Sequence, residues 1–308
     1  MKTLLIPERL KKGDLIGLIS PSSPTRYPER ITQGISYLIG KGYYVRLGWS
    51  VGSEEGYLAG SDDLRVHDLH EMFLDERVGA ILCTRGGYGS GRLLDLIDYD
   101  LVRAHPKILV GFSDITALSM ALLSQCGLLT FAGPMVAAEF ASASSAMVDE
   151  TFWQMVAARK ARRILTLGEE KVMKEGVASG PLIGGNLAVY CSLIGSKYLP
   201  DPKGSILFLE EVGENVYRID RMLLQLKHAG ILGAISGIIL GSFTAIPEDE
   251  PNREIDAVLR EYLMPLNIPI LSDFPFGHIP EKVTMPMGAN VKLDTKKRQL
   301  AVTQAVVS

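Results

Sequence analysis

Residues 108–133 decide the fold, and they read ILVGFSDITALSMALLSQCGLLTFAG. Ile108–Phe112 has the length and the β-branched content of a buried strand, and a helical stretch begins almost directly after it. The run over residues 115–138 carries no charge, but serines, a glutamine, a glycine and a proline interrupt it too often for a membrane span. We therefore expect a buried helix followed by a second buried strand at Leu128–Gly133.

The same alternation of strand and helix fills the rest of the first half. Strands are predicted at Leu15–Ser20, Tyr43–Gly48 and Ala80–Cys83, and helices at Glu29–Ile39 and at Asp62–Leu74, the latter capped by Ser61. This order predicts an α/β fold with a parallel sheet and helices on both faces. In such sheets, active groups gather beyond the carboxyl ends of the strands, so the residues that follow each strand are the candidates for function.

The second half has a different pattern. A helix is expected around Asp149–Ala158, and the polar, glycine-containing segment Gly168–Gly180 is interpreted as a linker. Further strands are predicted at Ser205–Glu210 and Gly237–Phe243, helices at Val216–Lys227 and Arg253–Leu263, and a terminal hairpin within Val291–Val307. We expect two domains, at residues 1–165 and 166–308, because a chain of 308 residues exceeds one typical domain.

The composition excludes several classes of protein. With 47% hydrophobic residues and a net charge of −3, the chain is not disordered. Its longest basic cluster, RKARR at Arg159–Arg163, is interpreted as a solvated helix end, so no nucleic-acid partner is expected. Three distant cysteines predict neither a disulfide framework nor a zinc ribbon. Because the N-terminus lacks the apolar region of a signal peptide, we expect a cytoplasmic protein with no membrane partner.

Ser113 is the first candidate for chemistry. It lies where a buried strand turns directly into a helix, which places its hydroxyl at the carboxyl edge of the sheet. The N–H of Asp114 points into the same space from the helix N-terminus, as an oxyanion donor would. Position alone favours a role for Ser113 or Asp114 as a helix cap, as is usual for serines before helices, so the nucleophile is a hypothesis at this point.

A glycine-rich loop, GGYGSG at residues 86–91, is the second candidate. Its spacing differs from G-x-G-x-x-G, and no Gly-Lys-Ser/Thr follows, so a nucleotide site is disfavoured. Glycines let the backbone approach a ligand closely and present N–H groups to an anion. Gly86 or Gly87 is therefore expected to contribute an oxyanion donor beside Ser113.

A serine nucleophile needs a base, and five histidines are available. His67 and His70 share one helix face, which is more typical of a solvated surface than of a metal site. His278 lies in the rigid segment Pro275–Pro280 (PFGHIP), which holds its side chain in place, although a purely structural histidine fits this loop equally well.

A carboxylate must orient that histidine, and Glu210, Glu211 and Glu214 follow or end the strand at Ser205–Glu210. Side chains alternate across a strand, so Glu210 and Glu211 cannot both face one cleft. The spacing of the residues leaves the choice between them open.

Seven ordered motifs resemble the LD-carboxypeptidase family of serine peptidases, and together they cover nearly the whole chain: LIGLISPSSP, GYLAGSDDLR, CTRGGYGSGRLL, VGFSDITAL, GPLIGGNL, LFLEEVGENVYRIDRML and FPFGHIPEKVTMPMG. The resemblance implies a Ser–Glu–His triad at Ser113, Glu210 and His278. It also implies oxyanion donors at Asp114 and at Gly86 or Gly87. The implied fold is a flavodoxin-like N-terminal domain with a smaller, β-rich α+β C-terminal domain.

The resemblance further implies release of terminal D-Ala from the L-centre of meso-diaminopimelate or L-Lys in murein tetrapeptides during peptidoglycan recycling. No metal or organic cofactor is implied, and a homodimer is expected. Arg85, Tyr217 and Arg218 are candidate substrate contacts. Because the triad spans both domains, we expect Ser113 and His278 to be poorly aligned in the free enzyme.

Three alternatives are weighed against this interpretation. Some family relatives hydrolyse acyl-sulfamoyl-adenylate toxins of the microcin type, but Trp49 and Trp153 lie outside the segment expected to stack a nucleotide. An α/β-hydrolase esterase is disfavoured because Ile115 stands where G-x-S-x-G requires glycine. A catalytically silent binding protein would instead use the glycine loop for an anion.

Overall fold

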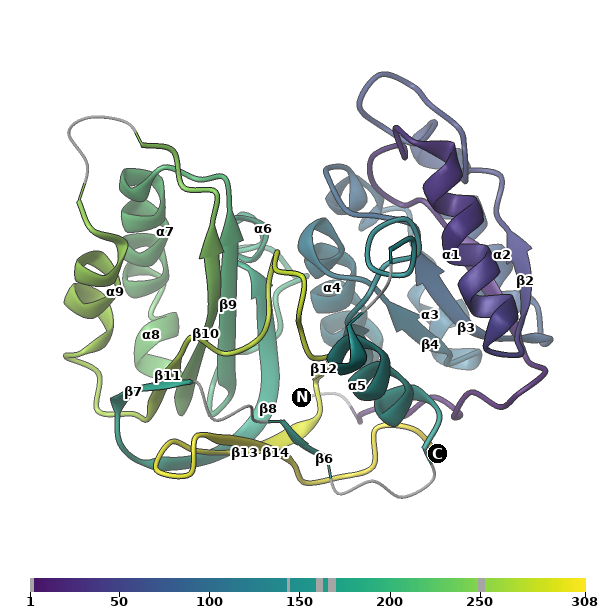
Figure 1. Cartoon of the computed structure of the whole chain (residues 1–308). Helices are drawn as coiled ribbons and strands as arrows, with labels where there is room; N and C mark the ends of the chain where they lie inside the picture. Colours follow the sequence, from purple (N-terminus) through teal and green to yellow (C-terminus); the bar gives the residue numbers. More distant parts are fainter. Residues whose placement is uncertain (1–2, 143–144, 159–162, 166–169, 249–252) are drawn as a thin grey trace.

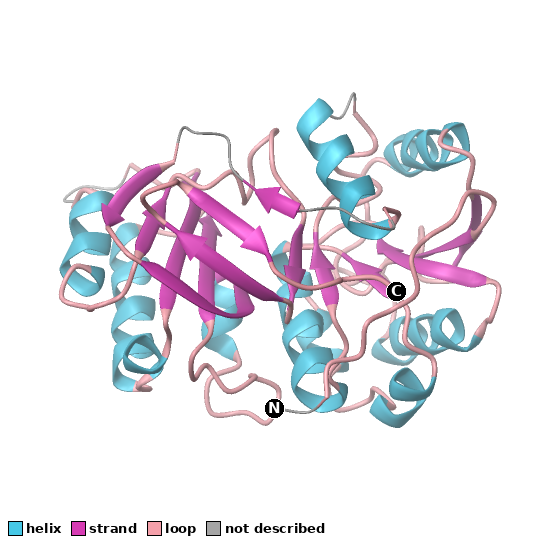
Figure 2. Ribbon diagram, turned by 90° about the horizontal axis from the view of Figure 1, so that it is seen from below, coloured by secondary structure: helices cyan, strands magenta, loops and turns pink. Residues whose placement is uncertain are grey.

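Two β-sheets organise this computed structural model, which describes residues 3–142, 145–158, 163–165, 170–248 and 253–308 (Figure 1). The first sheet has six strands in the order β12-β5-β4-β3-β1-β2, and the second has eight in the order β6-β14-β13-β8-β9-β10-β11-β7. Figure 2 shows helices on both faces of the first sheet and on one face of the second. The α/β architecture expected from the sequence is confirmed.

The first sheet contains the five strands predicted in the first half of the chain. They are β1 (Leu15–Ile19), β2 (Tyr44–Leu47), β3 (Val78–Cys83), β4 (Ile108–Val110) and β5 (Thr130–Ala132), and all neighbouring pairs among them are parallel. The helices are α1 (Pro28–Gly40), α2 (Asp62–Leu74), α3 (Tyr99–Ala104), α4 (Thr116–Cys126) and α5 (Ala146–Val156). As expected, Ser61 caps α2, because its hydroxyl accepts a hydrogen bond from the Leu64 N–H.

The second sheet combines a parallel centre with antiparallel edges. Its elements are β6 (Arg163–Leu165), β7 (Lys171–Lys174), β8 (Val177–Asn186), α6 (Leu187–Ser192), β9 (Ile206–Val212), α7 (Val216–His228), α8 (Ile231–Ala234), β10 (Gly237–Thr244), α9 (Ile255–Leu263), β11 (Ile270–Ser272), β13 (Asn290–Asp294) and β14 (Gln299–Val302). Strands β8 to β11 are parallel, and β13 and β14 form the expected terminal hairpin. Helices α7, α8 and α9 cover the side away from the first sheet (Figure 1).

Two sequence-based expectations about the middle of the chain need correction. The predicted linker, Gly168–Gly180, contains β7 and the start of β8, apart from residues 168 and 169, which lie outside the described residues. The side chains of the edge strand β7, and those at the start of the inner strand β8, are polar or partly exposed, as in a loop. Of the basic run Arg159–Arg163, only Arg163 is described, and it begins β6 rather than ending a helix.

The boundary expected between residues 165 and 166 does not separate the two sheets completely. Strand β12 (Met285–Met287), from the second half, pairs antiparallel with β5 and so becomes an edge of the first sheet. Among the described residues, no helix is long and apolar enough to cross a membrane.

The two sheets meet where β8 ends against the start of α4. A Cβ on Gly185 would lie 2.5 Å from Thr116 Oγ1, and the same hydroxyl oxygen accepts a hydrogen bond from the Asn186 N–H at 3.1 Å. Asn186 pairs in register with Glu210 on β9. This close backbone approach therefore places the carboxyl end of β9 within reach of the turn that begins α4.

Helix α1 offers a matched test of its packing against the loop that follows β5. A Cβ on Gly34 would lie 2.2 Å from the Val136 carbonyl oxygen, whereas a Cβ on Gly40 would meet nothing within 4 Å. We expect Gly34→Ala to lower the free energy of unfolding by about 1–3 kcal/mol, because overpacking forces backbone shifts. Gly40→Ala should leave it nearly unchanged. Urea denaturation followed by circular dichroism measures both, and equal effects would contradict the packing described here.

Candidate active site

The turn that carries Ser113 is strained. Ser113 has φ +63°, in the left-handed region that non-glycine residues rarely adopt, and Phe112 before it is extended. A Cβ on Gly111 would lie 2.9 Å from Ile115 Cγ1 and 3.1 Å from Cys83 Cβ, so only glycine fits there. The local sequence therefore turns β4 sharply into the short 3₁₀ helix Ser113–Ile115 and then into α4. Such turns expose a serine hydroxyl at the carboxyl edge of a sheet.

Ser113, His278 and Glu210 lie in one hydrogen-bonded line. His278 Nε2 is 3.1 Å from Ser113 Oγ, and His278 Nδ1 is 2.8 Å from Glu210 Oε2. Glu210 is fully buried, while the His278 side chain is 26% exposed. A carboxylate only accepts, so Nδ1 carries the proton and Nε2 is left to accept from the serine hydroxyl. In this conformation Ser113 and His278 are already within hydrogen-bond reach, and poorly aligned geometries in the free enzyme stay a prediction.

The loop that carries His278 is fixed from two sides. Ser242 on β10 donates its N–H to the Phe276 carbonyl oxygen at 2.8 Å, and the Phe276 ring packs edge-on against Phe208 with centroids 5.0 Å apart. Gly277 has φ +126°, and a Cβ there would lie 3.2 Å from Glu210 Oε2. Glycine at this position is thus required for the histidine and the glutamate to approach each other.

The Phe112 ring packs against the His278 imidazole, and Lys282 lies over the Phe112 ring. The sequence did not reveal this arrangement. The Phe112 ring lies 5.1 Å from the His278 ring, and Lys282 Nζ lies 4.0 Å from the centre of the Phe112 ring. Lys282 is almost fully buried and pairs with Glu139 at 2.6 Å. No local motif signals this cluster, because Phe112 and Glu139 are far in the chain from the loop that carries His278 and Lys282.

The two adjacent glutamates of β9 point to opposite sides, as strand alternation requires. Glu210 faces His278, whereas Glu211 accepts hydrogen bonds from Asn186 Nδ2 at 2.9 Å, the Ala188 N–H at 2.8 Å and the Val212 N–H at 2.9 Å. Burial raises the pKa of Glu211, although these hydrogen bonds oppose the rise. Glu214 lies beyond the strand and pairs with Arg218.

The glycine loop lies directly against the serine. A Cβ on Gly86 would be 3.2 Å from Ser113 Oγ and 3.4 Å from the Asp114 nitrogen. The carboxylate of Asp114 accepts from the Ser90 N–H at 2.8 Å and from Ser22 Oγ at 2.5 Å. It therefore joins the loop to the serine turn. The loop thus lies where oxyanion donors from Asp114 and from Gly86 or Gly87 are expected, and that role stays a prediction.

Arg65 is a further residue that the sequence analysis missed. Its side chain is fully buried on α2, and it donates to the carbonyl oxygens of Pro21 and Gly89 and to Asp62. Burial lowers the pKa of Arg65, and the charge of Asp62 opposes that change. Arg65 links the loop after β1 to the glycine loop. An arginine inside an otherwise helical pattern gives no signal of such a role.

The remaining candidates lie apart from the triad. Tyr217 and Arg218 are exposed at the start of α7, where Arg218 donates to the Tyr217 hydroxyl at 3.2 Å; no contact with the triad is found within the described ranges. His70 Nε2 accepts from the Asp98 N–H at 2.9 Å, which is a structural role. Across the part of the chain that the structure describes, no group of three or more His, Cys, Asp or Glu side chains could hold a metal ion.

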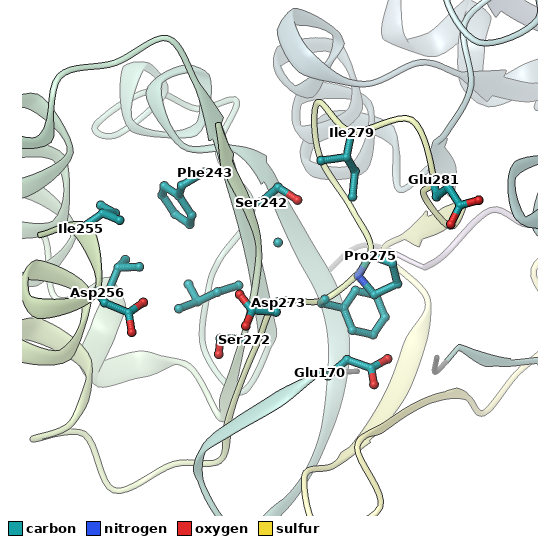
Figure 3. Close-up of a pocket in the computed structure, with 14 residues that line it drawn as sticks. Glu170, Ser242, Phe243, Ile255, Asp256, Ser272, Asp273, Pro275, Ile279 and Glu281 are labelled. Atoms are coloured by element: carbon teal, nitrogen blue, oxygen red, sulfur yellow. The ribbon is translucent and has the colours of Figure 1, made fainter. Parts of the chain in front are cut away.

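A cavity of about 440 Å³ lies beside the His278 loop, between β10 and α9 (Figure 3). Its lining includes Pro275 and Ile279 from that loop and four acidic residues, Glu170, Asp256, Asp273 and Glu281. Ser113 does not line it. Asp273 pairs with Lys171, and Asp256 with Arg260. Among the described residues no Lys or Arg lines the cavity itself, so it offers an anionic substrate no cationic partner.

Comparisons with known proteins match both parts of the chain to one family. Residues 16–133 match the family model of the LD-carboxypeptidase N-terminal domain, and residues 179–293 match that of the LD-carboxypeptidase C-terminal domain. A probable murein peptide carboxypeptidase of Bacillus subtilis is 37% identical over 98% of this chain and 95% of its own length.

Two solved structures are similar over almost the full length. Muramoyltetrapeptide carboxypeptidase from Oxalobacter formigenes has a TM-score of 0.83 at 30% identity, covering 93% of this chain and 97% of its own. The protein MccF, solved in complex with glutamyl sulfamoyl guanosine, has a TM-score of 0.92 at 27% identity, covering 99% of this chain and 100% of its own.

The opposite orientations of the β9 glutamates predict different effects on stability. In Glu211→Gln, an amide NH₂ would replace one of two oxygens that accept backbone or side-chain N–H groups. We expect a loss of about 1–3 kcal/mol in the free energy of unfolding, because a buried donor loses its partner. Glu210→Gln should cost less, since Glu210 has one hydrogen-bond partner among the described residues, and that imidazole can still accept from the amide NH₂ in its other tautomer. Chemical denaturation of both variants checks this, and a larger loss for Glu210→Gln would contradict it.

Proposed function

The chain belongs to the LD-carboxypeptidase family, and we propose that it is a serine-type member that removes the terminal D-Ala from murein tetrapeptides. The bond cleaved would join D-Ala to the L-centre of meso-diaminopimelate or L-Lys. One observation carries the proposal: the hydrogen-bonded line from Ser113 through His278 to Glu210, at 3.1 and 2.8 Å. The residue roles below are part of the proposal.

Ser113 is the proposed nucleophile. His278 Nε2 accepts the proton of the Ser113 hydroxyl as its Oγ attacks the carbonyl carbon of the scissile amide. Glu210 keeps the proton of the imidazole on Nδ1 and stabilises the imidazolium that forms. Because Glu210 is fully buried, its negative charge acts on His278 with little screening by water.

The negative oxygen of the tetrahedral intermediate needs donors that are already in place. The Asp114 N–H and one N–H of the Gly86–Gly87 pair are the proposed donors, and Gly86 lies directly against Ser113. The imidazolium of His278 then gives its proton to the amine of D-Ala, which leaves. A water molecule attacks the acyl-enzyme with His278 as base and releases the shortened peptide.

The biological setting is proposed from the relatives. Relatives named as murein carboxypeptidases support a place in peptidoglycan recycling and cell-wall turnover. For this chain we propose a cytoplasmic homodimer whose residues 1–165 carry the nucleophile and whose residues 166–308 supply Glu210 and His278.

Hydrolysis of an acyl-sulfamoyl-adenylate toxin is the second candidate, and the similarity to MccF favours it. The tryptophans of this chain do not support nucleotide stacking on the second sheet. Trp153 stacks on Tyr43 with ring centroids 4.9 Å apart, inside the aromatic cluster of the first domain. Trp49 is exposed just after β2, at the far edge of the first sheet.

Incubation of the purified protein with L-Ala-γ-D-Glu-meso-diaminopimelate-D-Ala tests the function. We expect mass spectrometry to show loss of one alanine, and we expect the rate to be unchanged by a chelator, because the proposed steps use only side chains and backbone N–H groups. Ser113→Ala should be inactive. Faster cleavage of a glutamyl sulfamoyl adenosine would favour the second candidate, and activity that a chelator abolishes and zinc restores would refute the serine mechanism.

Glu210→Gln and Glu211→Gln form a matched pair for the mechanism. We expect Glu210→Gln to reduce kcat by on the order of 10⁴, because the amide leaves the imidazole in the wrong tautomer. Glu211→Gln should keep most of kcat at a temperature where it is folded, since Glu211 faces away from His278. Steady-state kinetics on the tetrapeptide measures both. Equal losses would mean that the orientation of the two glutamates does not determine catalysis.

A further inference from the structure

A second hollow, of about 520 Å³, lies beside the glycine loop. It is formed by the loops that follow β1, β2 and β3, which all end at the carboxyl edge of the first sheet. The lining residues are Ser23, Pro24, Arg26, Glu54, Gly56, Tyr57 and Arg85. We call this hollow the arginine pocket.

The arginine pocket holds two positive charges that lack counter-ions. Arg85 makes one hydrogen bond, from Nη1 to the Pro24 carbonyl oxygen at 3.1 Å. Among the described residues, neither Arg85 nor Arg26 has a carboxylate within ion-pair distance, and Glu54 pairs with neither. Burial lowers the pKa of Arg85, and the charge of Arg26 lowers it further. Two neighbouring guanidinium groups with free donors are a site for an anion.

The arginine pocket lies next to the nucleophile. A Cβ on Gly87 would lie 3.5 Å from Arg85 Nη2, and a Cβ on Gly86 would lie 3.2 Å from Ser113 Oγ. Gly86 and Gly87 are consecutive in this loop, so the Arg85 guanidinium and the Ser113 hydroxyl lie near adjacent residues. Ser23 holds this arrangement in place, because its hydroxyl oxygen accepts from the Tyr88 N–H at 3.1 Å.

A peptide cut next to its last residue presents a carboxylate two bonds beyond the nitrogen of the scissile amide. Among the described residues, no Lys or Arg lines the cavity beside the His278 loop (Figure 3). The arginine pocket, in contrast, presents two guanidinium groups to such a carboxylate. Resting on the proposed function, we infer that Arg85, supported by Arg26, binds the terminal carboxylate of the departing D-Ala. Arg85 would thereby restrict the enzyme to the last peptide bond.

Substrates with and without the charge test this inference. Wild type should cleave the tetrapeptide about 10- to 100-fold more efficiently, by kcat/KM, than the same peptide with a C-terminal carboxamide, because a charge-assisted pair is lost. Arg85→Gln should lose most of this preference while retaining the slow rate on the carboxamide, and Arg85→Lys should restore part of it. Arg77→Gln, on an exposed arginine at the opposite end of β3, is the control and should keep the full preference.

An unchanged preference in Arg85→Gln, or an equal loss on both substrates in a protein with unaltered Tm, would overturn the inference while leaving the proposed function intact. If wild type cleaves neither peptide, the proposed function fails. Ligand binding then tests whether Arg85 recognises a carboxylate. Calorimetry with Ser113→Ala then compares L-Lys-D-Ala with its carboxamide. A preference for the free carboxylate that Arg85→Gln removes supports the arginine pocket, and no such preference overturns it.

Discussion

The left-handed conformation of Ser113 is the constraint on which the rest of the site depends. A residue with a side chain keeps φ +63° only where its surroundings leave no relaxed alternative. Here Gly111 admits the close approach of Ile115, and the buried carboxylate of Asp114 is held by Ser22 and Ser90. The same contacts also fix the glycine loop beside the serine. Strain at the nucleophile and order in the proposed oxyanion donors thus have one physical origin.

The second requirement is that two sheets meet with a fixed separation, because Ser113 belongs to one and Glu210 to the other. The close approach of Gly185 to Thr116 sets this separation, and Thr116 lies only three residues after Ser113. No side chain other than hydrogen fits at Gly185, which also has φ +126°. The loop carrying His278 then bridges the sheets, since β11 before it lies in the second sheet and β12 after it pairs with β5 in the first. The loop that carries the proposed base, His278, is therefore anchored in both sheets.

Local pattern predicted the five strands of the first half and the strand-to-helix turn at Ser113, because hydrophobic periodicity and turns are properties of neighbouring residues. Residues that act through distant contacts were not predictable in this way. The stack of His278, Phe112 and Lys282 and the buried Arg65 join segments far apart in the chain. Strand alternation required Glu210 and Glu211 to point apart without choosing between them. The family resemblance implied Glu210, and it is Glu210 that lies 2.8 Å from His278 Nδ1. The edge strand β7 was taken for a linker, because edge strands carry the polar composition of loops.

Two adjacent carboxylates buried at the end of an apolar strand would repel each other and lose their hydration, so each needs its own compensation. Glu210 faces the imidazole, and Glu211 accepts three hydrogen bonds from the turn that joins β8 to α6 and from its own strand. Those bonds fix β8 against β9 in the register that pairs Asn186 with Glu210. Asn186 in turn donates its N–H to Thr116 at the start of α4. The buried charge of Glu211 thus stabilises the geometry in which Glu210 reaches His278, and for that reason a costly carboxylate stands at both positions.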